Sequence, residues 1–301
     1  MKLFGGTASV QLTEKIGKAL GIPCLPVDQH IFPDGERRVR ISGDVVGESV
    51  VIVQSACPPV DTNYMELFFL IDAVKRSGAE KITAVIPYFG YQRQDHIFRD
   101  GEAVSLEVVI RILESLEIDR MLSIDMHSSR IPDLFTIPAE QISAMPLFAQ
   151  TITEHHWATG DTVLISPDTG GVRRIEELAQ LLDLPYAVLE KERNLDSGEI
   201  AITGLEEGLV ENKKRAIIVD DMMASGKTTV FAAEFLKKQG IEEIIAFATH
   251  PIFSSDAPTI LQQSAISHVF VTDTVVVPQE KQFSKLTLLS VAPLLAKAIQ
   301  E

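Results

Sequence analysis

Residues Ala216–Thr229 read AIIVDDMMASGKTT: an apolar run, two adjacent carboxylates, a loop of small residues and the start of a helical pattern. The β-branched run is typical of a strand in a buried parallel sheet. Backbone N–H groups of a small-residue loop, with the positive end of the helix that follows, form a site suited to a phosphate. Carboxylates directly before the loop can accept hydrogen bonds from sugar hydroxyls. The stretch therefore predicts a strand, loop and helix that bind a phosphorylated sugar.

Two other interpretations of this stretch stay open at this point. The end of the loop, Gly226 to Thr228, resembles the end of the phosphate loop of nucleoside triphosphatases. That loop requires a glycine five residues before Gly226, and the residue there is Asp221, which disfavours the interpretation. An ordinary helix start with a solvated Lys227 is the second alternative.

The same alternation of elements continues along the chain. Short β-branched runs alternate with longer segments of helical period, which predicts an α/β protein with mostly parallel sheets flanked by helices. In such sheets ligands lie at the carboxyl ends of the strands. The predicted strands are Ser49–Gln54, Lys81–Pro87, Arg120–Asp125, Thr162–Ser166, Arg215–Asp220 and Glu243–Thr249.

Two parts of the sequence resemble each other. The run 50–53 leads through a loop and a helical pattern to a glycine and the run 81–85, and the run 216–219 leads in the same way to 243–247. In both, the glycine stands where a helix would end. The pattern predicts a duplication with two tandem domains, 1–147 and 148–301, the second of which carries the small-residue loop.

Composition narrows the function classes. A length of 301 residues fits two domains of ordinary size. The formal net charge of -15 disfavours nucleic acid or an anionic membrane as a partner. The longest uncharged stretch, 257–272, contains proline, glutamine and histidine, so we expect no membrane span, and residues 1–6 lack the apolar run of a signal peptide. Two cysteines, Cys24 and Cys57, form no disulfide framework, so we expect a cytosolic protein.

Further motifs surround the decisive stretch in a fixed order: Phe32–Glu36, Pro87–Asp95, Asp125–His127, Ser166–Val172, Thr249–Pro251 and Ser290–Leu295. Together with Asp220–Thr228 they resemble the ribose-phosphate pyrophosphokinase (phosphoribosyl diphosphate synthetase) family. The resemblance implies two tandem domains of the type I phosphoribosyltransferase fold. It also implies a Mg²⁺-dependent transfer of the diphosphate group of ATP to the anomeric hydroxyl of ribose 5-phosphate, which leaves AMP and serves nucleotide biosynthesis.

The resemblance also assigns site residues. It implies that Lys191 and Arg193 are catalytic, on a lid over the triphosphate, and that His127 and Asp168 hold Mg²⁺. ATP would be bound by Phe32, Asp34, Gly35, Glu36, Arg93, Gln94 and Asp95. Ribose 5-phosphate would be bound by Arg193, Asp220, Asp221, Ala224, Ser225, Gly226, Lys227 and Thr228. Because the family supplies the Phe32–Glu36 turn from a neighbouring subunit, a homo-oligomer is implied.

Departures from the family pattern leave a rival function open. The loop lacks the usual acid at Ala224 and gains Lys227, which is compatible with a catalytically silent synthetase-like subunit that binds phosphoribosyl ligands. A phosphoribosyltransferase acting on a base would leave the ATP-like motifs unexplained. The segments His96–Glu102 and Arg130–Phe135 also differ from the family, so the resemblance does not extend to activation by phosphate or inhibition by ADP.

Overall fold

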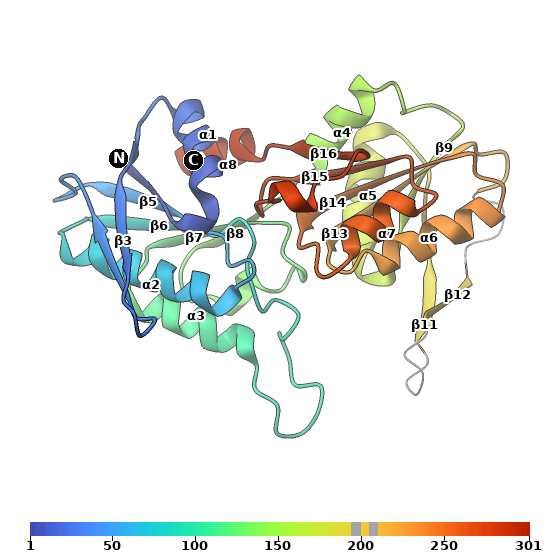
Figure 1. Ribbon diagram of the computed structural model, residues 1–301. Helices are drawn as coiled ribbons and strands as arrows, with labels where there is room; N and C mark the ends of the chain where they lie inside the picture. The colour runs from blue at the N-terminus through green and yellow to red at the C-terminus, as the bar shows by residue number, and fades with distance from the viewer. Residues whose placement is uncertain (194–199, 205–209) are drawn as a thin grey trace. The chain divides into compact units, whose positions relative to one another are not determined.

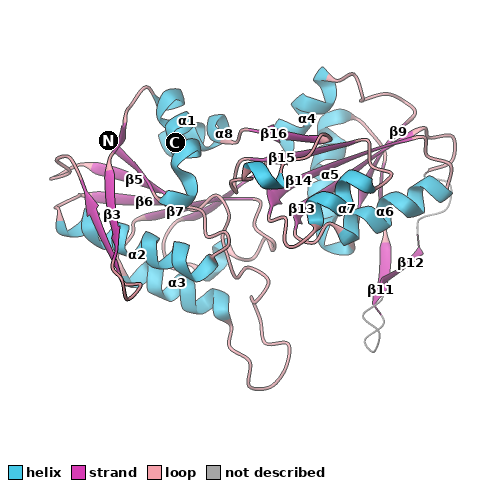
Figure 2. Ribbon diagram, viewed as in Figure 1, coloured by secondary structure: helices cyan, strands magenta, loops and turns pink. Residues whose placement is uncertain are grey.

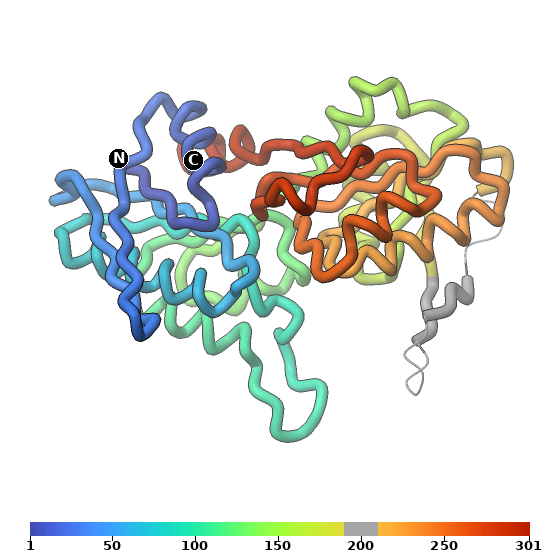
Figure 3. The backbone as a smooth tube through the Cα atoms, viewed as in Figure 1, coloured from blue at the N-terminus to red at the C-terminus, as the bar shows by residue number. Residues whose placement is uncertain are grey.

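The computed structural model describes residues 1–193, 200–204 and 210–301, with the backbone alone described for 190–193 and 200–204. Contacts divide the chain into two compact units. Unit 1 comprises Met1–Ile142, Thr274–Val276 and Ser290–Glu301, and unit 2 comprises Ser143–Asp273 and Val277–Leu289. Figure 3 traces the chain from unit 1 through unit 2 to the C-terminal residues, which belong to unit 1 again.

Unit 1 contains a six-stranded parallel sheet of order β2-β1-β5-β6-β7-β8. Its strands are β1 (Lys2–Gly5), β2 (Cys24–Leu25), β5 (Ser49–Val53), β6 (Lys81–Val85), β7 (Arg120–Ile124) and β8 (Ala139–Ile142). Its helices are α1 (Val10–Leu20), α2 (Val60–Arg76), α3 (Ser105–Ser115) and α8 (Ala292–Gln300). One face of the sheet is covered by α2 and α3, and α1 with α8 covers the other (Figure 1).

Unit 2 repeats this arrangement in a parallel sheet of order β10-β9-β13-β14-β15-β16. Its strands are β9 (Thr162–Ser166), β10 (Tyr186–Val188), β13 (Arg215–Met223), β14 (Glu243–Pro251), β15 (His268–Thr272) and β16 (Leu286–Leu289). Its helices are α4 (Met145–Glu154), α5 (Val172–Leu182), α6 (Lys227–Lys238) and α7 (Ala257–Gln263). The expected α/β class, with parallel sheets flanked by helices, is confirmed.

Each unit also carries an antiparallel hairpin at the same point of its strand order (Figure 2). In unit 1, β3 (Val27–Ile31) and β4 (Arg37–Ile41) follow the edge strand β2, and in unit 2, β11 (Glu190–Arg193) and β12 (Ile200–Gly204) follow β10. Short 3₁₀ turns occur at η1 (Thr7–Ser9), η2 (Pro132–Leu134), η3 (Thr169–Gly171) and η4 (Gln279–Lys281). The matching strand order and hairpins support the duplication predicted from the sequence.

The contact units differ from the sequence-based domains 1–147 and 148–301 at three places, one of which is the assignment of Thr274–Val276 to unit 1. The division falls between Ile142 and Ser143, and the C-terminal helix α8 belongs to unit 1. The physical reason is packing: α8 buries Leu295, Ala296 and Ala298 and packs against α1. Proximity along the sequence does not determine which core a terminal helix joins.

All six predicted strands are present, and two of them extend further than expected. β13 continues past Asp220 to Met223 because Met222 and Met223 pair with His250 and Pro251 of β14. The two carboxylates therefore lie within the sheet rather than at its margin. Within the described residues, none of the helices combines the length and the apolarity that a membrane crossing needs.

Candidate functional site

The acid pair of unit 2 is buried within β13. Asp220 is 8% exposed and Asp221 is 3% exposed. Side chains alternate between the faces of a strand, so Asp220 follows Ile218 onto the face covered by α6, and Asp221 lies on the opposite face, where α5 packs. The backbone N–H of Asp221 also donates to Asp220 Oδ1 at 2.9 Å.

Burial, followed by the charge of Asp221 and then that of Asp168, raises the pKa of Asp220 well above its usual value, and Arg174 opposes the shift. Desolvation and a neighbouring like charge both disfavour the ionised carboxyl, which is the physical cause of the change. A hydroxyl-rich ligand or a cation would relieve this repulsion. The pair is therefore prepared to bind a polar ligand.

Arg174, which the sequence analysis missed, faces the acid pair from α5. Its Nη2 lies 3.6 Å from Asp221 Oδ1, and its side chain is 12% exposed. Among the described residues, its buried Nε has no hydrogen-bond partner. The position of Arg174 two residues after the Ser166–Val172 motif was the available signal, but the sequence does not tell which of Arg173 and Arg174 points inward.

The small-residue loop leads from β13 into α6. Gly226 takes the left-handed conformation (φ 73°) at the helix N-cap, where no side chain caps the helix. The carbonyl of Ala224 accepts from the N–H of Ser254 at 2.9 Å, which fixes the loop from one side. Because the first N–H groups of a helix have no intrahelical acceptor, the uncapped start of α6 offers donors to an anion.

The structure thus brings five predicted phosphate-loop residues, Ala224, Ser225, Gly226, Lys227 and Thr228, directly after the acid pair. Lys227 is exposed at the first position of α6, and its N–H lies 3.5 Å from Ser225 Oγ. A nucleoside-triphosphatase loop is contradicted, because Asp221 is a buried strand residue facing Arg174 rather than part of a phosphate loop.

Asp168 lies on the turn after β9, also in unit 2. Its Oδ1 accepts from the N–H of Gly170 at 3.1 Å, and its carbonyl accepts from Ser166 Oγ at 2.8 Å. A Cβ on Gly171 would approach Ser166 Oγ to 2.3 Å, so the turn requires glycine there. Because β9 pairs with β13 in parallel, the turn after β9 lies at the same edge of the sheet as the acid pair, and the charge of Asp168 contributes to the raised pKa of Asp220.

The Phe32–Glu36 turn forms the tip of the β3–β4 hairpin in unit 1. The N–H of Phe32 donates to the carbonyl of Glu36 at 2.8 Å, and the N–H of Glu36 donates to Asp34 Oδ1 at 3.1 Å. Gly35 has a φ of 92°, which favours glycine. Phe32 is 39% exposed beside the ring of His30. The tip therefore presents an aromatic ring and two carboxylates outward.

The loop after β6 places Arg93, Gln94 and Asp95 in unit 1, with Arg93 and Gln94 exposed and Asp95 partly so. His127 is exposed on the segment after β7, and its N–H donates to Gln92 Oε1 at 2.8 Å. Gln92, which is 1% exposed, was not identified from the sequence. This one side chain joins the predicted ATP loop to the predicted metal ligand.

Other predicted residues are less completely placed. Lys191 and Arg193 lie on β11, but their side chains, and the lid residues 194–199, are outside the described part of the chain. His127 belongs to unit 1 and Asp168 to unit 2, and each is described within its own unit. Among described residues there is no group of three or more His, Cys, Asp or Glu side chains arranged to hold a metal.

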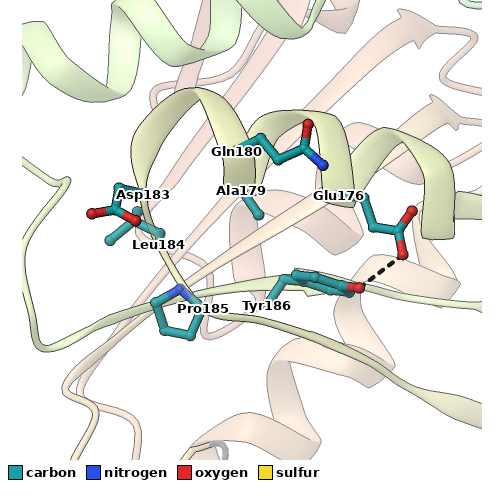
Figure 4. Close-up of a pocket in the computed structure, with 7 residues that line it drawn as sticks. All are labelled: Glu176, Ala179, Gln180, Asp183, Leu184, Pro185 and Tyr186. Carbon is teal, nitrogen blue, oxygen red and sulfur yellow. Dashed lines mark hydrogen bonds between the residues drawn. The ribbon is translucent and has the colours of Figure 1, made fainter.

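A large surface hollow of unit 2 is separate from all these residues. It has a volume of about 610 Å³ and lies between α5 and β10 (Figure 4). Within it, the hydroxyl of Tyr186 donates to Glu176 Oε1 at 2.8 Å. The lining residues are Glu176, Ala179, Gln180, Asp183, Leu184, Pro185 and Tyr186. None of the predicted site residues lines it, so the chemistry of the strand ends, not the size of a hollow, locates the candidate site.

A duplicated parallel α/β unit with a buried acid pair before an uncapped helix start defines a protein of the phosphoribosyl-binding α/β class. Comparisons with known proteins make the family specific. The profile described as the N-terminal domain of ribose phosphate pyrophosphokinase matches residues 1–116, and the profile of the phosphoribosyl synthetase-associated domain matches residues 207–301.

Relatives extend the similarity over the whole chain. The chain is 38% identical over 299 residues to ribose-phosphate pyrophosphokinase 1 of Streptococcus pyogenes, covering 99% of this chain and 93% of that protein. It is 38% identical over 300 residues to ribose-phosphate pyrophosphokinase of Gloeobacter violaceus, covering 99% and 89%. The crystal structure of phosphoribosylpyrophosphate synthetase from Mycobacterium smegmatis matches with a TM-score of 0.90 and 34% identity, covering 99% and 97%. The chain belongs to the ribose-phosphate pyrophosphokinase family.

Proposed function

We infer that the chain makes phosphoribosyl diphosphate by transferring the diphosphate group of ATP to the anomeric hydroxyl of ribose 5-phosphate, with AMP as the second product. The observation that carries this inference is similarity to named synthetases over 99% of the chain, which includes both units. The chemistry of the acid pair and the α6 loop is compatible with it. The reaction is an in-line displacement at the β-phosphorus of ATP, so catalysis depends on positioning and charge neutralisation.

Ribose 5-phosphate binding is assigned to unit 2. The uncapped N-terminus of α6 and the loop Ala224–Thr228 would bind the 5-phosphate through backbone N–H groups. Asp220 and Asp221 would bind the ribose hydroxyls; the raised pKa of Asp220 favours its protonated form, which can also donate a hydrogen bond. Arg174 would hold Asp221 in place for this role.

ATP binding is assigned to residues of unit 1. Phe32 would stack on the adenine, and Arg93 would contact a phosphate. The exposed hairpin tip, with Phe32, Asp34, Gly35 and Glu36, is compatible with completion of a neighbouring subunit's ATP site, as the family resemblance implies. The proposal therefore includes a homo-oligomer in which ATP sites are shared between subunits. Gln94 and Asp95 lie on the same loop as Arg93 and would contact the nucleotide as well.

Mg²⁺ is the proposed cofactor, with His127 and Asp168 as ligands. Mg²⁺ takes few protein ligands and keeps several waters together with substrate phosphates, so a small number of protein side chains fits this ion. The Asp168 carboxylate is held in orientation by the N–H of Gly170. When bound, the ion would neutralise charge on the phosphate oxygens.

Lys191 and Arg193 are the proposed catalytic cations. Both residues lie on β11, and a positive charge is the kind of group that stabilises the charge developing on a transferring phosphate chain. We also place the protein in the cytoplasm, without nucleic-acid or membrane partners. The net charge of -15 and two free thiols support that location.

A direct assay tests the proposed reaction. The purified chain is incubated with ATP, ribose 5-phosphate and Mg²⁺, and AMP and phosphoribosyl diphosphate are quantified together. We expect equal amounts of both products, and none when either substrate is omitted. AMP release that does not depend on ribose 5-phosphate would contradict the proposal. Omitting Mg²⁺, or replacing it with Ca²⁺, tests the cofactor separately.

A further inference from the structure

A fully buried carboxylate of unit 1, Glu66 on α2, has no part in the proposed chemistry. Its side chain is 0% exposed. It accepts hydrogen bonds from the N–H and the hydroxyl of Thr7, each at 2.5 Å. It also accepts a short hydrogen bond from Gln29 Nε2, and Arg37 Nη1 lies 3.7 Å from its Oε2. Four donor groups from three segments therefore converge on one carboxylate.

Two of these donors come from the hairpin that carries the Phe32–Glu36 turn. Gln29 lies on β3 and Arg37 on β4, where Arg37 is the first strand residue after the turn. Residue pairing sets Gln29 opposite Val39 and Ile31 opposite Arg37, so both polar side chains lie on the inner face of the hairpin. Glu66 thus accepts a hydrogen bond from β3 and forms an ion pair with the first residue of β4.

The base of the hairpin is held differently from its tip. Val27 and Ile41 pair at the base and pack against the hydrophobic core of unit 1, as does Val39 opposite Gln29. Nearer the tip, the inner-face residues Gln29 and Arg37 are polar and contact Glu66. Apolar packing therefore fixes where the hairpin begins, and the carboxylate fixes the direction in which its tip projects.

Burying a carboxylate costs free energy of folding unless hydrogen-bond donors surround it. The donors around Glu66 are therefore held in the positions in which they contact it. The remaining two donors, from Thr7, tie the same carboxylate to the loop after β1. That loop is anchored a second time, because the N–H of Ala8 donates to the buried Gln54 Oε1 at 3.1 Å. Glu66 therefore links the hairpin to a loop that is also hydrogen-bonded to Gln54.

We propose that Glu66 is a positioning residue that sets the orientation of the Phe32–Glu36 turn and so determines affinity for ATP. This rests on the proposed role of that turn in ATP binding. Glu66 cannot contact the nucleotide itself, because its side chain is fully buried. It acts through Gln29 and Arg37.

Glu66→Gln tests the proposal with nearly unchanged shape, because an amide replaces one of the accepting oxygens. Loss of hydrogen bonds to a buried charge should raise KM for ATP by about tenfold or more. KM for ribose 5-phosphate should stay within about twofold, because the α6 loop is in the other unit. Asp72→Asn is the matched control on the same helix: Asp72 pairs with Arg76 on the surface, and its variant should match the parent in both constants.

A second variant, Gln29→Ala, removes the hydrogen bond between Gln29 and Glu66 and leaves the hydrogen bonds of Thr7 to Glu66 intact. It should therefore keep the fold, and it serves as the test if Glu66→Gln proves unstable. It should raise KM for ATP in the same direction. In Glu66→Gln, hydrogen exchange should become faster in residues 29–39 than in the control, while α6 is unchanged.

Unchanged KM for ATP in a folded Glu66→Gln or Gln29→Ala protein would overturn the proposal. So would an equal loss for both substrates, because that pattern indicates general destabilisation. The parent protein decides the proposed function independently: if it forms no phosphoribosyl diphosphate, the reaction is wrong. Even then, the hydrogen-exchange rates of residues 29–39 in Glu66→Gln show whether Glu66 orders the hairpin.

Discussion

The two units share one strand order but differ at the helix that follows the third strand of each sheet. In unit 2, β13 delivers Asp220 and Asp221 and is followed by the small-residue loop and the uncapped start of α6. In unit 1, the equivalent helix α2 follows the buried segment Gln54–Cys57 and starts after Pro59. Asn63 Nδ2 of α2 donates to the carbonyl of Cys57 at 2.7 Å. The start of α2 also has no side-chain cap, so the difference is that no acid pair precedes it.

The two units therefore share a fold but carry different polar residues at equivalent positions. The proposed sugar-phosphate residues of unit 2 lie on β13 and the loop after it, whereas the proposed ATP residues of unit 1 lie on the hairpin tip and on the loop after β6. The two hairpins differ in the same way. β3–β4 presents an aromatic ring and carboxylates, and β11–β12 carries Lys191 and Arg193.

The largest expected effect is a loss of kcat when a cation of the unit 2 hairpin is removed. Lys191→Ala should lower kcat by about 10²-fold or more with smaller changes in KM, because its cation acts on charge that develops in the transition state. Arg193→Ala should behave similarly. Steady-state kinetics measure both, with Lys238→Ala on α6 as the control. Near-normal kcat in Lys191→Ala would remove the catalytic assignment.

A mixing experiment sharpens the comparison of the hairpins. Phe32→Ala/Glu36→Ala subunits and Lys191→Ala subunits should each have strongly reduced activity alone, about 10²-fold lower for Lys191→Ala. If the unit 1 hairpin serves a neighbour, mixing should restore activity, up to about a quarter of the sites for random assembly. Subunit exchange is verified with differently tagged chains. No recovery despite exchange would place each ATP site within a single chain.

The acid pair of unit 2 should show a trade-off between stability and binding that unit 1 lacks. Asp220→Asn should raise KM for ribose 5-phosphate by about tenfold, because a buried acceptor for a sugar hydroxyl is lost. The same variant should melt at a higher temperature than the parent at neutral pH without substrate. Glu234→Gln, an exposed acid on α6, is the control and should show neither effect.

The pH dependence follows from the raised pKa of Asp220. The folded protein holds this proton to a higher pH than the unfolded chain, so the stabilisation is complete below the unfolded pKa and is lost as pH rises through the folded pKa. The difference in melting temperature between Asp220→Asn and the parent should therefore be small in acid and grow with pH. A difference that is constant with pH would contradict the buried repulsive pair.

The smallest effect concerns the departure at Lys227. Because Lys227 is exposed, its charge beside a bound phosphate is screened. Lys227→Ala should raise KM for ribose 5-phosphate by about two- to fivefold, with kcat and KM for ATP unchanged. Lys238→Ala at the other end of α6 is again the control. An unchanged KM would mean that Lys227 is only a solvated helix residue.

Sequence patterns predicted the parts of the molecule that depend on local order. The six strands predicted from short β-branched runs are all present in the structure. The run Ala216–Thr229 indicated the strand, loop and helix of the candidate site. Hydrogen-bond partners distant in sequence were not predictable. Arg174 and Gln92 act through contacts with Asp221 and His127, and no local pattern indicates such pairs.

Glu66 shows the same limit in unit 1. A single glutamate in an amphipathic helix is usually solvated, yet this one is buried because residues 7, 29 and 37 converge on it. The assignment of α8 to unit 1 also depended on packing, because its apolar face would suit either core. Tertiary contacts, rather than weak local signals, account for these omissions.

The fate of isotopically labelled ATP tests the central claim most directly. With ATP labelled at the β-phosphorus, the proposed reaction should transfer the label to the sugar product, leave unlabelled AMP, and require ribose 5-phosphate. The Lys191→Ala protein should perform this transfer about 10²-fold more slowly. Label retained in ADP would mean that only the γ-phosphoryl group is transferred or hydrolysed, which would contradict the assignment of this chain as a diphosphate-transferring enzyme.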